Sequence, residues 1–141
     1  MVGSASVHRM SGLFLLVVMG VWTAASAPAP ADTGFPFDTE LLLDADPMRG
    51  SKRVPILTVG PKGDTLIELW CNSVQSQFVV VDNTLTILTT GQKSERQCDP
   101  ERMRADEDLL AALLEVTGWR WENDLLVLRG SRAVRFRRST H

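Results

Sequence analysis

Two cysteines are the residues whose types and spacing point most directly to a chemistry. Cys71 ends the strand-like run 66–72, and Cys98 stands directly before the expected helix start at Asp99. Because the chain has no third cysteine and opens with an export-type segment, we expect one intramolecular disulfide. A redox-active pair is the alternative. Such pairs usually have two residues between their cysteines at a helix start, and only Cys98 lies near one.

Other reactive side chains are scarce. The histidines are His8, in the export-type segment, and His141, at the last position, where fraying is expected. We therefore expect no catalytic residue that needs a positioned imidazole, no metal site and no cofactor. The acidic clusters 44–46 and 106–108 lack the spacing and glycine of an EF-hand loop, so we interpret them as solvated charge.

The N-terminal segment has the three parts of a secretory signal peptide. His8 and Arg9 precede an apolar run at 13–22, and small residues follow at 23–27. The apolar run is shorter than the roughly 20 residues that cross a bilayer, so an uncleaved anchor is the weaker alternative. We expect a periplasmic or secreted protein without a stable transmembrane anchor.

The expected domain organisation follows from this signal. Residues 1–27 form the signal peptide, residues 28–38 an Ala/Pro leader, and residues 39–141 a single domain large enough for one core. Cleavage would follow Ala25, Ala27 or Ala31. Fifteen basic and 17 acidic residues give no positive balance, so we expect no nucleic-acid partner. We expect a monomer.

Hydrophobic periodicity predicts an α+β fold. Asp99 is a natural N-cap, Pro100 suits the first helical position, and an apolar stripe through Leu110 and Leu113 predicts a helix over about 100–117, with Gly118 as its left-handed terminator. Period-two alternation predicts about eight short strands around it. They cover residues 41–43, 52–59, 65–72, 77–81, 84–88, 119–121, 125–128 and 133–137. We expect a mostly antiparallel sheet or partial barrel packed against the helix.

The order of these elements resembles the META domain, including the HslJ-like proteins of bacterial envelopes. The resemblance covers about residues 64–138. It lies in Cys71-Asn72 after a strand, Cys98 before an acidic-start helix with Leu-x-x-Leu-Leu spacing, and Trp119-x-Trp121 before a Leu-rich strand. It implies an exported or membrane-attached protein, a disulfide between the paired cysteines and a loose link to envelope stress. It implies no defined molecular activity.

Several residues could contact a ligand or partner. Arg96 stands where the META domain normally has an apolar residue, so it is either exposed at the sheet rim or buried in an ion pair. A polar cleft joining Glu68, Asn72 and Arg96 would indicate a small-ligand or catalytic site. The tryptophans at 119 and 121 share a strand face, which is a stacking platform if exposed and otherwise packs at the core or rim. The candidate binding residues are Trp70, Asn72, Arg96, Trp119 and Trp121.

The C-terminal region carries the one local excess of positive charge. Its arginines are Arg129, Arg132, Arg135, Arg137 and Arg138. Alternation sends Arg135 and Arg137 to the outer face, where positive charge discourages edge-to-edge strand pairing. Contact with an anionic envelope surface is the alternative function of this cluster.

Together these patterns favour a non-catalytic accessory or binding protein of the envelope or periplasm, associated with the stress response. Its expected partner is an envelope protein or an anionic envelope surface. An interaction module or inhibitor acting on an envelope enzyme is the second hypothesis. An enzyme that works through carboxylates, with Glu68 or the acidic cluster 106–108, is the third.

Overall fold

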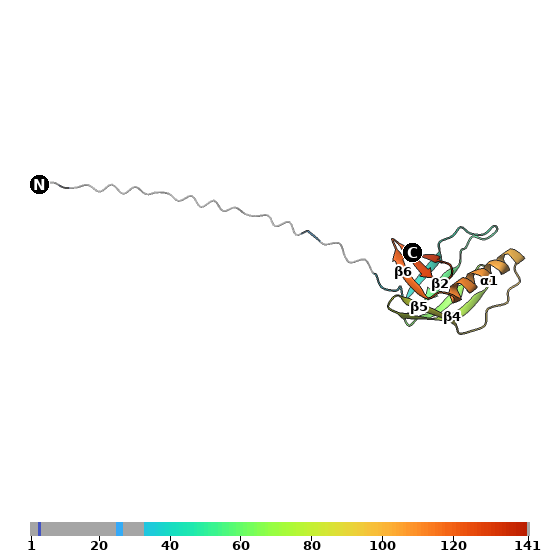
Figure 1. Cartoon of the computed structure of the whole chain (residues 1–141). Helices are drawn as coiled ribbons and strands as arrows, with labels where there is room; N and C mark the ends of the chain where they lie inside the picture. Colours follow the sequence, from blue (N-terminus) through green and yellow to red (C-terminus); the bar gives the residue numbers. More distant parts are fainter. Residues whose placement is uncertain (1–2, 4–24, 27–32, 141) are drawn as a thin grey trace. The chain divides into compact units, whose positions relative to one another are not determined.

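Eight antiparallel strands in the described part of the chain close into a barrel (Figure 1). The computed structural model describes residues 3, 25–26 and 33–140, so the expected signal peptide and most of the leader lie outside the described residues. The strands are β1 (Thr39–Leu43), β2 (Ile56–Val59), β3 (Asp64–Glu68), β4 (Ser73–Val81), β5 (Thr84–Thr89), β6 (Gly118–Glu122), β7 (Leu125–Arg129) and β8 (Val134–Arg138). Each pairs with its neighbour in sequence, and β8 pairs with β1. The predicted α+β class with about eight strands and one helix is confirmed.

Alternating side chains fill the barrel. In β4, Val74, Ser76 and Phe78 are buried, and in β8 Phe136 is buried while Arg135 and Arg137 are exposed. Because successive side chains of a strand point to opposite faces, this alternation puts one face of each strand in the core. The fully buried side chains include Leu41, Leu57, Ile67, Phe78, Leu85, Leu113, Leu126, Leu128 and Phe136.

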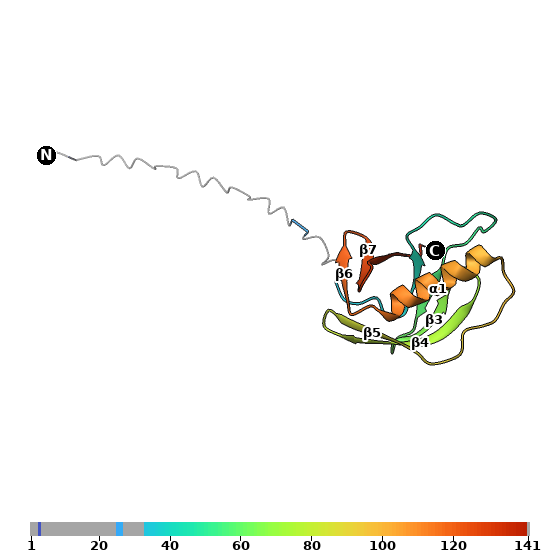
Figure 2. The same ribbon diagram turned by 45° about the vertical axis from the view of Figure 1, so that its right-hand side comes forward.

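Helix α1 (Pro100–Leu114) follows β5 and lies between the strands β3–β5 and the strands β6–β8 (Figure 2). At this place β5 and β6 are joined by a single residue pair, Thr84 with Gly118. Within the helix, the side chains of Ala112 and Leu113 are buried. None of the helices in the described residues has the length and apolar composition that crossing a bilayer requires.

The helix begins as predicted and ends earlier. The Asp99 side chain accepts a hydrogen bond from the backbone N–H of Arg102, which satisfies one of the free donors of the first turn. The helix ends at Leu114 and not near residue 117, with Glu115 as its C-cap in a right-handed conformation. Gly118 is therefore not the helix terminator but the first residue of β6. A Cβ atom there would lie 3.0 Å from the backbone oxygen of Asn83, which is closer than most Cβ contacts in proteins.

The strand predicted at 65–72 is too long. β3 ends at Glu68, and the backbone N–H of Leu69 donates to the carbonyl of Asn72 at 2.7 Å. This bond reverses the chain so that β4 can pair with β3 in the antiparallel sense, from Glu68 with Ser73 onward. We call residues 69–72 the β3–β4 corner.

The folded domain begins before β1. Phe35, assigned to the leader from the sequence, is buried against Phe78 and Trp119, with ring centroids 6.3 and 5.3 Å apart. The backbone carbonyl of Gly34 accepts the indole N–H of Trp121 at 3.0 Å. Every described core residue lies between Phe35 and Phe136. The described hydrophobic core therefore lies wholly within residues 33–140.

Candidate functional site

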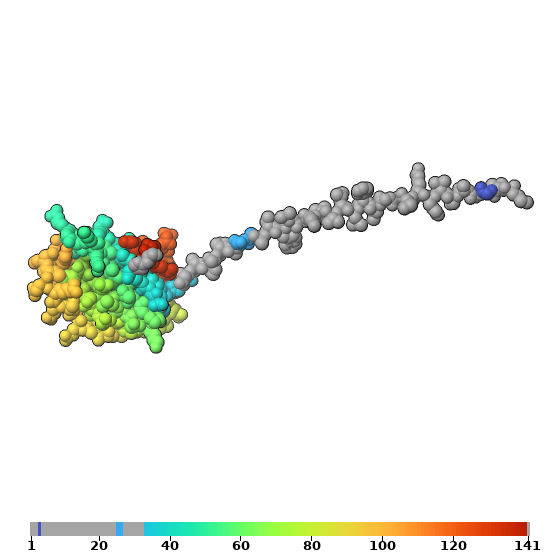
Figure 3. Space-filling view, turned by 180° about the vertical axis from the view of Figure 1, so that it is seen from behind, coloured from blue at the N-terminus to red at the C-terminus, as the bar shows by residue number. Residues whose placement is uncertain are grey.

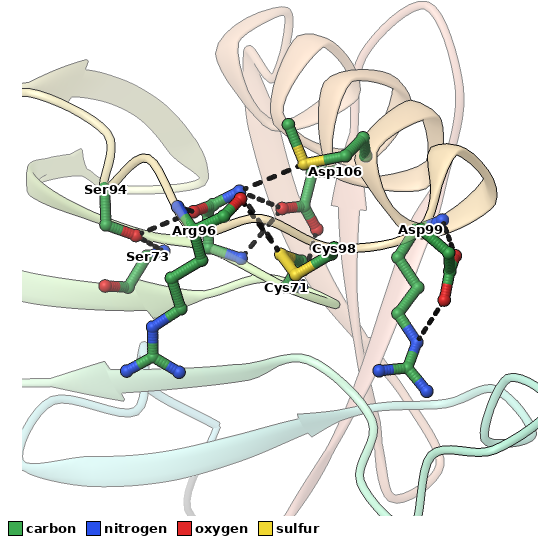
Figure 4. Close-up of a disulfide and its surroundings, with 10 residues drawn as sticks. Cys71, Ser73, Ser94, Arg96, Cys98, Asp99 and Asp106 are labelled. Carbon is green, nitrogen blue, oxygen red and sulfur yellow. Dashed lines mark hydrogen bonds and ion pairs between the residues drawn. A yellow bond between two sulfur atoms is a disulfide. The ribbon is translucent and has the colours of Figure 1, made fainter.

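The β3–β4 corner is covalently tied to the segment that leads into α1. Cys71 and Cys98 form a disulfide bond whose Cα atoms lie 6.3 Å apart, within the usual range (Figure 4). The bond joins residues 27 positions apart in the sequence. It therefore fixes the corner against the segment that begins α1.

A buried carboxylate holds the same corner from the helix side. Asp106 of α1 is 0% exposed, and it is the only charged side chain that is buried in the described part of the chain. Its oxygens accept the backbone N–H groups of Cys71 at 3.0 Å and Asn72 at 2.8 Å, and the Asn72 side-chain amide at 3.2 Å. These three N–H donors of the corner therefore share one buried acceptor, which spares them the cost of burial without a partner.

Asn72 extends this network to the loop before the helix. It is 3% exposed, and its side-chain oxygen accepts the backbone N–H of Arg96 at 2.7 Å and the hydroxyl of Ser94 at 3.0 Å. Ser94 in turn bonds both backbone groups of Ser73, with its N–H donating at 2.9 Å and its hydroxyl accepting at 3.0 Å. One amide side chain thus positions the corner, the loop and the backbone of Arg96 together.

The sequence interpretation of 106–108 as solvated charge is wrong for Asp106. A usable signal was present, because Asp106 falls on the same helical stripe as Met103, Leu110 and Leu113, spaced three and four residues apart. A single carboxylate within an apolar stripe indicates a buried acceptor that needs donors from another element.

A cleft of about 370 Å³ opens beside the corner. It is lined by residues 50–54, Ile56, residues 68–73, Arg96 and Arg102. Three segments that are distant in sequence therefore meet here: the β1–β2 loop, the β3–β4 corner and the region around the start of α1. The disulfide forms part of the wall, since Cys71 lines the cleft.

The cleft brings together the polar residues that the sequence singled out as a possible small-ligand site. Glu68, Asn72 and Arg96 all line it, and so does the half-buried Trp70. Arg96 is exposed rather than buried, and Figure 4 shows its side chain extending from the loop away from α1. Sequence reasoning missed the contributions of the β1–β2 loop and of Arg102, because their approach depends on how the loop packs against the helix.

The tryptophans at 119 and 121 do not form an exposed platform. Trp119 is 5% exposed, and its indole N–H donates to the backbone oxygen of Asp82 at 2.9 Å. Trp121 is half-buried, and the guanidinium of Arg138 lies 4.7 Å from the centre of its ring. Trp119 is packed in the core and Trp121 at the rim of the barrel, so together they form no exposed stacking surface.

The C-terminal arginines lie in several different environments. Arg132 donates to the backbone oxygen of Asp108 at 2.8 Å, and Arg135 lies 4.0 Å from the carboxylate of Glu122. A hydrogen bond from Arg120, strengthened by the charges of Arg120 and Arg135, holds the pKa of Glu122 below its ordinary value. Arg129 lines a second hollow beside β6, about 550 Å³ in volume.

The architecture is a closed eight-stranded antiparallel barrel with one helix and a disulfide-tied corner. The chain belongs to the META domain family, whose model matches residues 38–141. It is similar to an NMR structure of a protein from Burkholderia xenovorans, with 19% identity, a TM-score of 0.61, and coverage of 84% of this chain and 97% of that one. A second NMR structure shares 16% identity with a TM-score of 0.56, covering 71% of this chain and 88% of the other. At these identities the likeness concerns the fold alone. No curated protein matches the chain in sequence.

Proposed function

We propose that this META domain protein is an exported, non-catalytic accessory protein of the cell envelope that binds a small ligand in the cleft beside its disulfide. The observation that carries the proposal is the cleft itself, which joins Glu68, Asn72 and Arg96 in one polar cavity. Its volume of about 370 Å³ falls in the range of small-molecule sites. Export is supported by the signal-like N-terminus and by the oxidised cysteine pair.

The arrangement of carboxylates favours binding over catalysis. Asp106 is fully buried and its oxygens are occupied by three N–H donors, so it cannot reach a substrate. Glu68 lines the cleft without a histidine beside it in the described residues, so general acid–base work would fall to that side chain alone. An interaction module that uses the tryptophan face has little support, because Trp119 is buried and Trp121 is half-covered.

Native mass spectrometry of the exported protein tests the proposal. The protein is recovered from the periplasm under non-reducing conditions, incubated with envelope extract and weighed intact. We expect a mature chain cut after Ala25, Ala27 or Ala31, with both thiols oxidised and a bound small molecule. The Arg96→Glu variant should lose the bound molecule, whereas Arg104→Glu, an exposed change on α1 outside the cleft, should keep it.

Two results would contradict the proposal. Retention of the bound mass by Arg96→Glu would place the ligand elsewhere, and chemical conversion of the ligand on incubation would make the protein an enzyme. A protein recovered in the cytoplasm with free thiols would remove the export part.

A further inference from the structure

The charges that line the cleft are unbalanced. Four cationic side chains face one carboxylate, that of Glu68, which gives a formal charge of +3 (4 − 1). The cations come from three segments and are Lys52, Arg53, Arg96 and Arg102. Figure 3 shows two of these segments on one face, with the chain near residue 50 (green-blue) beside α1 (orange). A hydrogen bond from Arg102 to the backbone oxygen of Arg49 joins them.

Most of these cations have no partner among the described residues. The side chains of Lys52, Arg53 and Arg96 make no hydrogen bond or ion pair with another described residue. Arg102 has a partly exposed ion pair with Asp99 at 3.5 Å. Like charges gathered around one cavity repel one another, and a bound anion converts this repulsion into attraction.

We propose that the cleft binds a phosphate group carried by a small molecule or a lipid headgroup; this inference rests on the proposed function. Guanidinium groups present planar forks of N–H donors that match phosphate oxygens, and a phosphate monoester carries close to two negative charges. Because Asp99 already pairs with Arg102, the other three cations exceed the Glu68 carboxylate by two charges, and a simple carboxylate ligand would neutralise only one of them. The cavity leaves room beside a phosphate for a small organic group against Trp70.

The backbone that presents Arg96 is already fixed before any ligand arrives. Its N–H is held by Asn72 at 2.7 Å, and the disulfide at Cys98 ties down the same loop two residues later. Arg102 is held in the first turn of α1 by the Asp99 cap. Preorganised donors lose less conformational entropy on binding, so even inorganic phosphate should bind measurably.

The test is a titration of the oxidised domain 32–141 followed by two-dimensional NMR, with inorganic phosphate, glycerol 3-phosphate, acetate and glycerol as the probes. We expect phosphate and glycerol 3-phosphate to shift the amide signals of residues 50–54, 68–73 and 96, acetate to bind more weakly, and glycerol to do nothing. Arg96→Gln should weaken phosphate binding about tenfold or more, as loss of a charged hydrogen bond predicts.

Two further variants predict different directions of change in phosphate affinity. Glu68→Gln removes the one carboxylate of the cleft lining and should tighten phosphate binding several-fold. Arg104→Gln removes the same charge as Arg96→Gln from an exposed site on α1 and should leave the affinity within about twofold. Thermal unfolding of each variant confirms that the fold is intact. Equal weakening by Arg96→Gln and Arg104→Gln, or weaker binding in Glu68→Gln, would overturn the assignment.

A second experiment, with lipid vesicles, distinguishes a lipid headgroup from a free phosphate compound as the source of the phosphate. Phosphatidylcholine vesicles with and without phosphatidic acid are floated with the protein, and free glycerol 3-phosphate is added as competitor. Capture that needs phosphatidic acid and is lost in Arg96→Gln assigns a lipid headgroup, and binding of the soluble probes alone assigns a free phosphate compound. Capture that persists in Arg96→Gln and is lost in Arg137→Gln would overturn the cleft as the site and assign the C-terminal arginines. Absence of phosphate binding with a retained cleft ligand in native mass spectrometry would refute this inference and leave the proposed function standing.

Discussion

Replacing Asp106 with alanine tests whether a buried carboxylate holds the β3–β4 corner. The change removes the acceptor of three N–H groups, at 3.0, 2.8 and 3.2 Å, in a place that is 0% exposed. A buried donor left without a partner costs about 1–3 kcal/mol. Three such donors would together cost about 3–9 kcal/mol, and water entering the space left by the side chain recovers part of that sum, so we expect a destabilisation of about 4 kcal/mol.

That value is a large share of the total stability of a domain this size. Folded domains are stable by about 5–15 kcal/mol, so the variant should still fold at 25 °C. For roughly 110 residues, a loss of about 4 kcal/mol lowers Tm by about 15 °C. The assay is unfolding of the oxidised protein by heat and, separately, by urea, followed by circular dichroism. Each unfolding curve is analysed as a single two-state transition.

The matched control is Asp108→Ala, on the same helix and exposed. Loss of an exposed carboxylate should change stability by no more than about 0.5 kcal/mol. A drop in Tm for Asp106→Ala no larger than that for Asp108→Ala would refute the reasoning, since the corner would then be held without its buried acceptor.

Three further predictions follow from the same structure. Cys71→Ser opens a covalent loop of 27 residues and should cost roughly 3.5 kcal/mol in the chain-entropy model, and unlike the native protein its Tm should not respond to dithiothreitol. Arg120→Gln should raise the pKa of Glu122 toward its ordinary value in a carboxyl NMR titration; because that pKa is lowered in the fold, the stabilisation is present above the unfolded pKa of about 4.3 and is lost as pH falls through the folded value. Gly63→Ala should lower Tm strongly, because φ is +84° and a Cβ atom would meet the Phe78 carbonyl oxygen at 2.2 Å; an unchanged Tm would contradict that geometry.

The strands and the helix could be predicted because their signals are local. Alternation in the run 133–137 and the Asp99-Pro100 start depend only on nearby residues, and the structure has β8 and α1 there. The β3–β4 corner could not be located in this way. Leu69 and Trp70 continue the apolar run of β3, so nothing in the residue types marks the point at which the chain reverses.

The candidate site was predictable only in part, for a related reason. Glu68, Asn72 and Arg96 could be grouped because Cys71 and Cys98 bring their segments together. The β1–β2 loop has no such covalent mark. The approach of this loop to the start of α1 depends on the packing of the whole barrel. For the same reason, the pattern of strands and turns in the sequence does not predict that Phe35 is buried in the core.

The β3–β4 corner is held by more interactions than a reversal of the chain requires. A single backbone bond from Leu69 to Asn72 is enough to join two antiparallel strands, as short turns do elsewhere. Here a disulfide and the connected hydrogen bonds of the Asp106 carboxylate and the Asn72 amide add further restraints to the same four residues. All three act on residues 71 and 72, which line the cleft, and the Asn72 side chain also holds the backbone N–H of Arg96. These restraints fix the backbone from which Arg96 projects, and a fixed cationic group is what the proposed anion site would need to bind with little loss of conformational entropy.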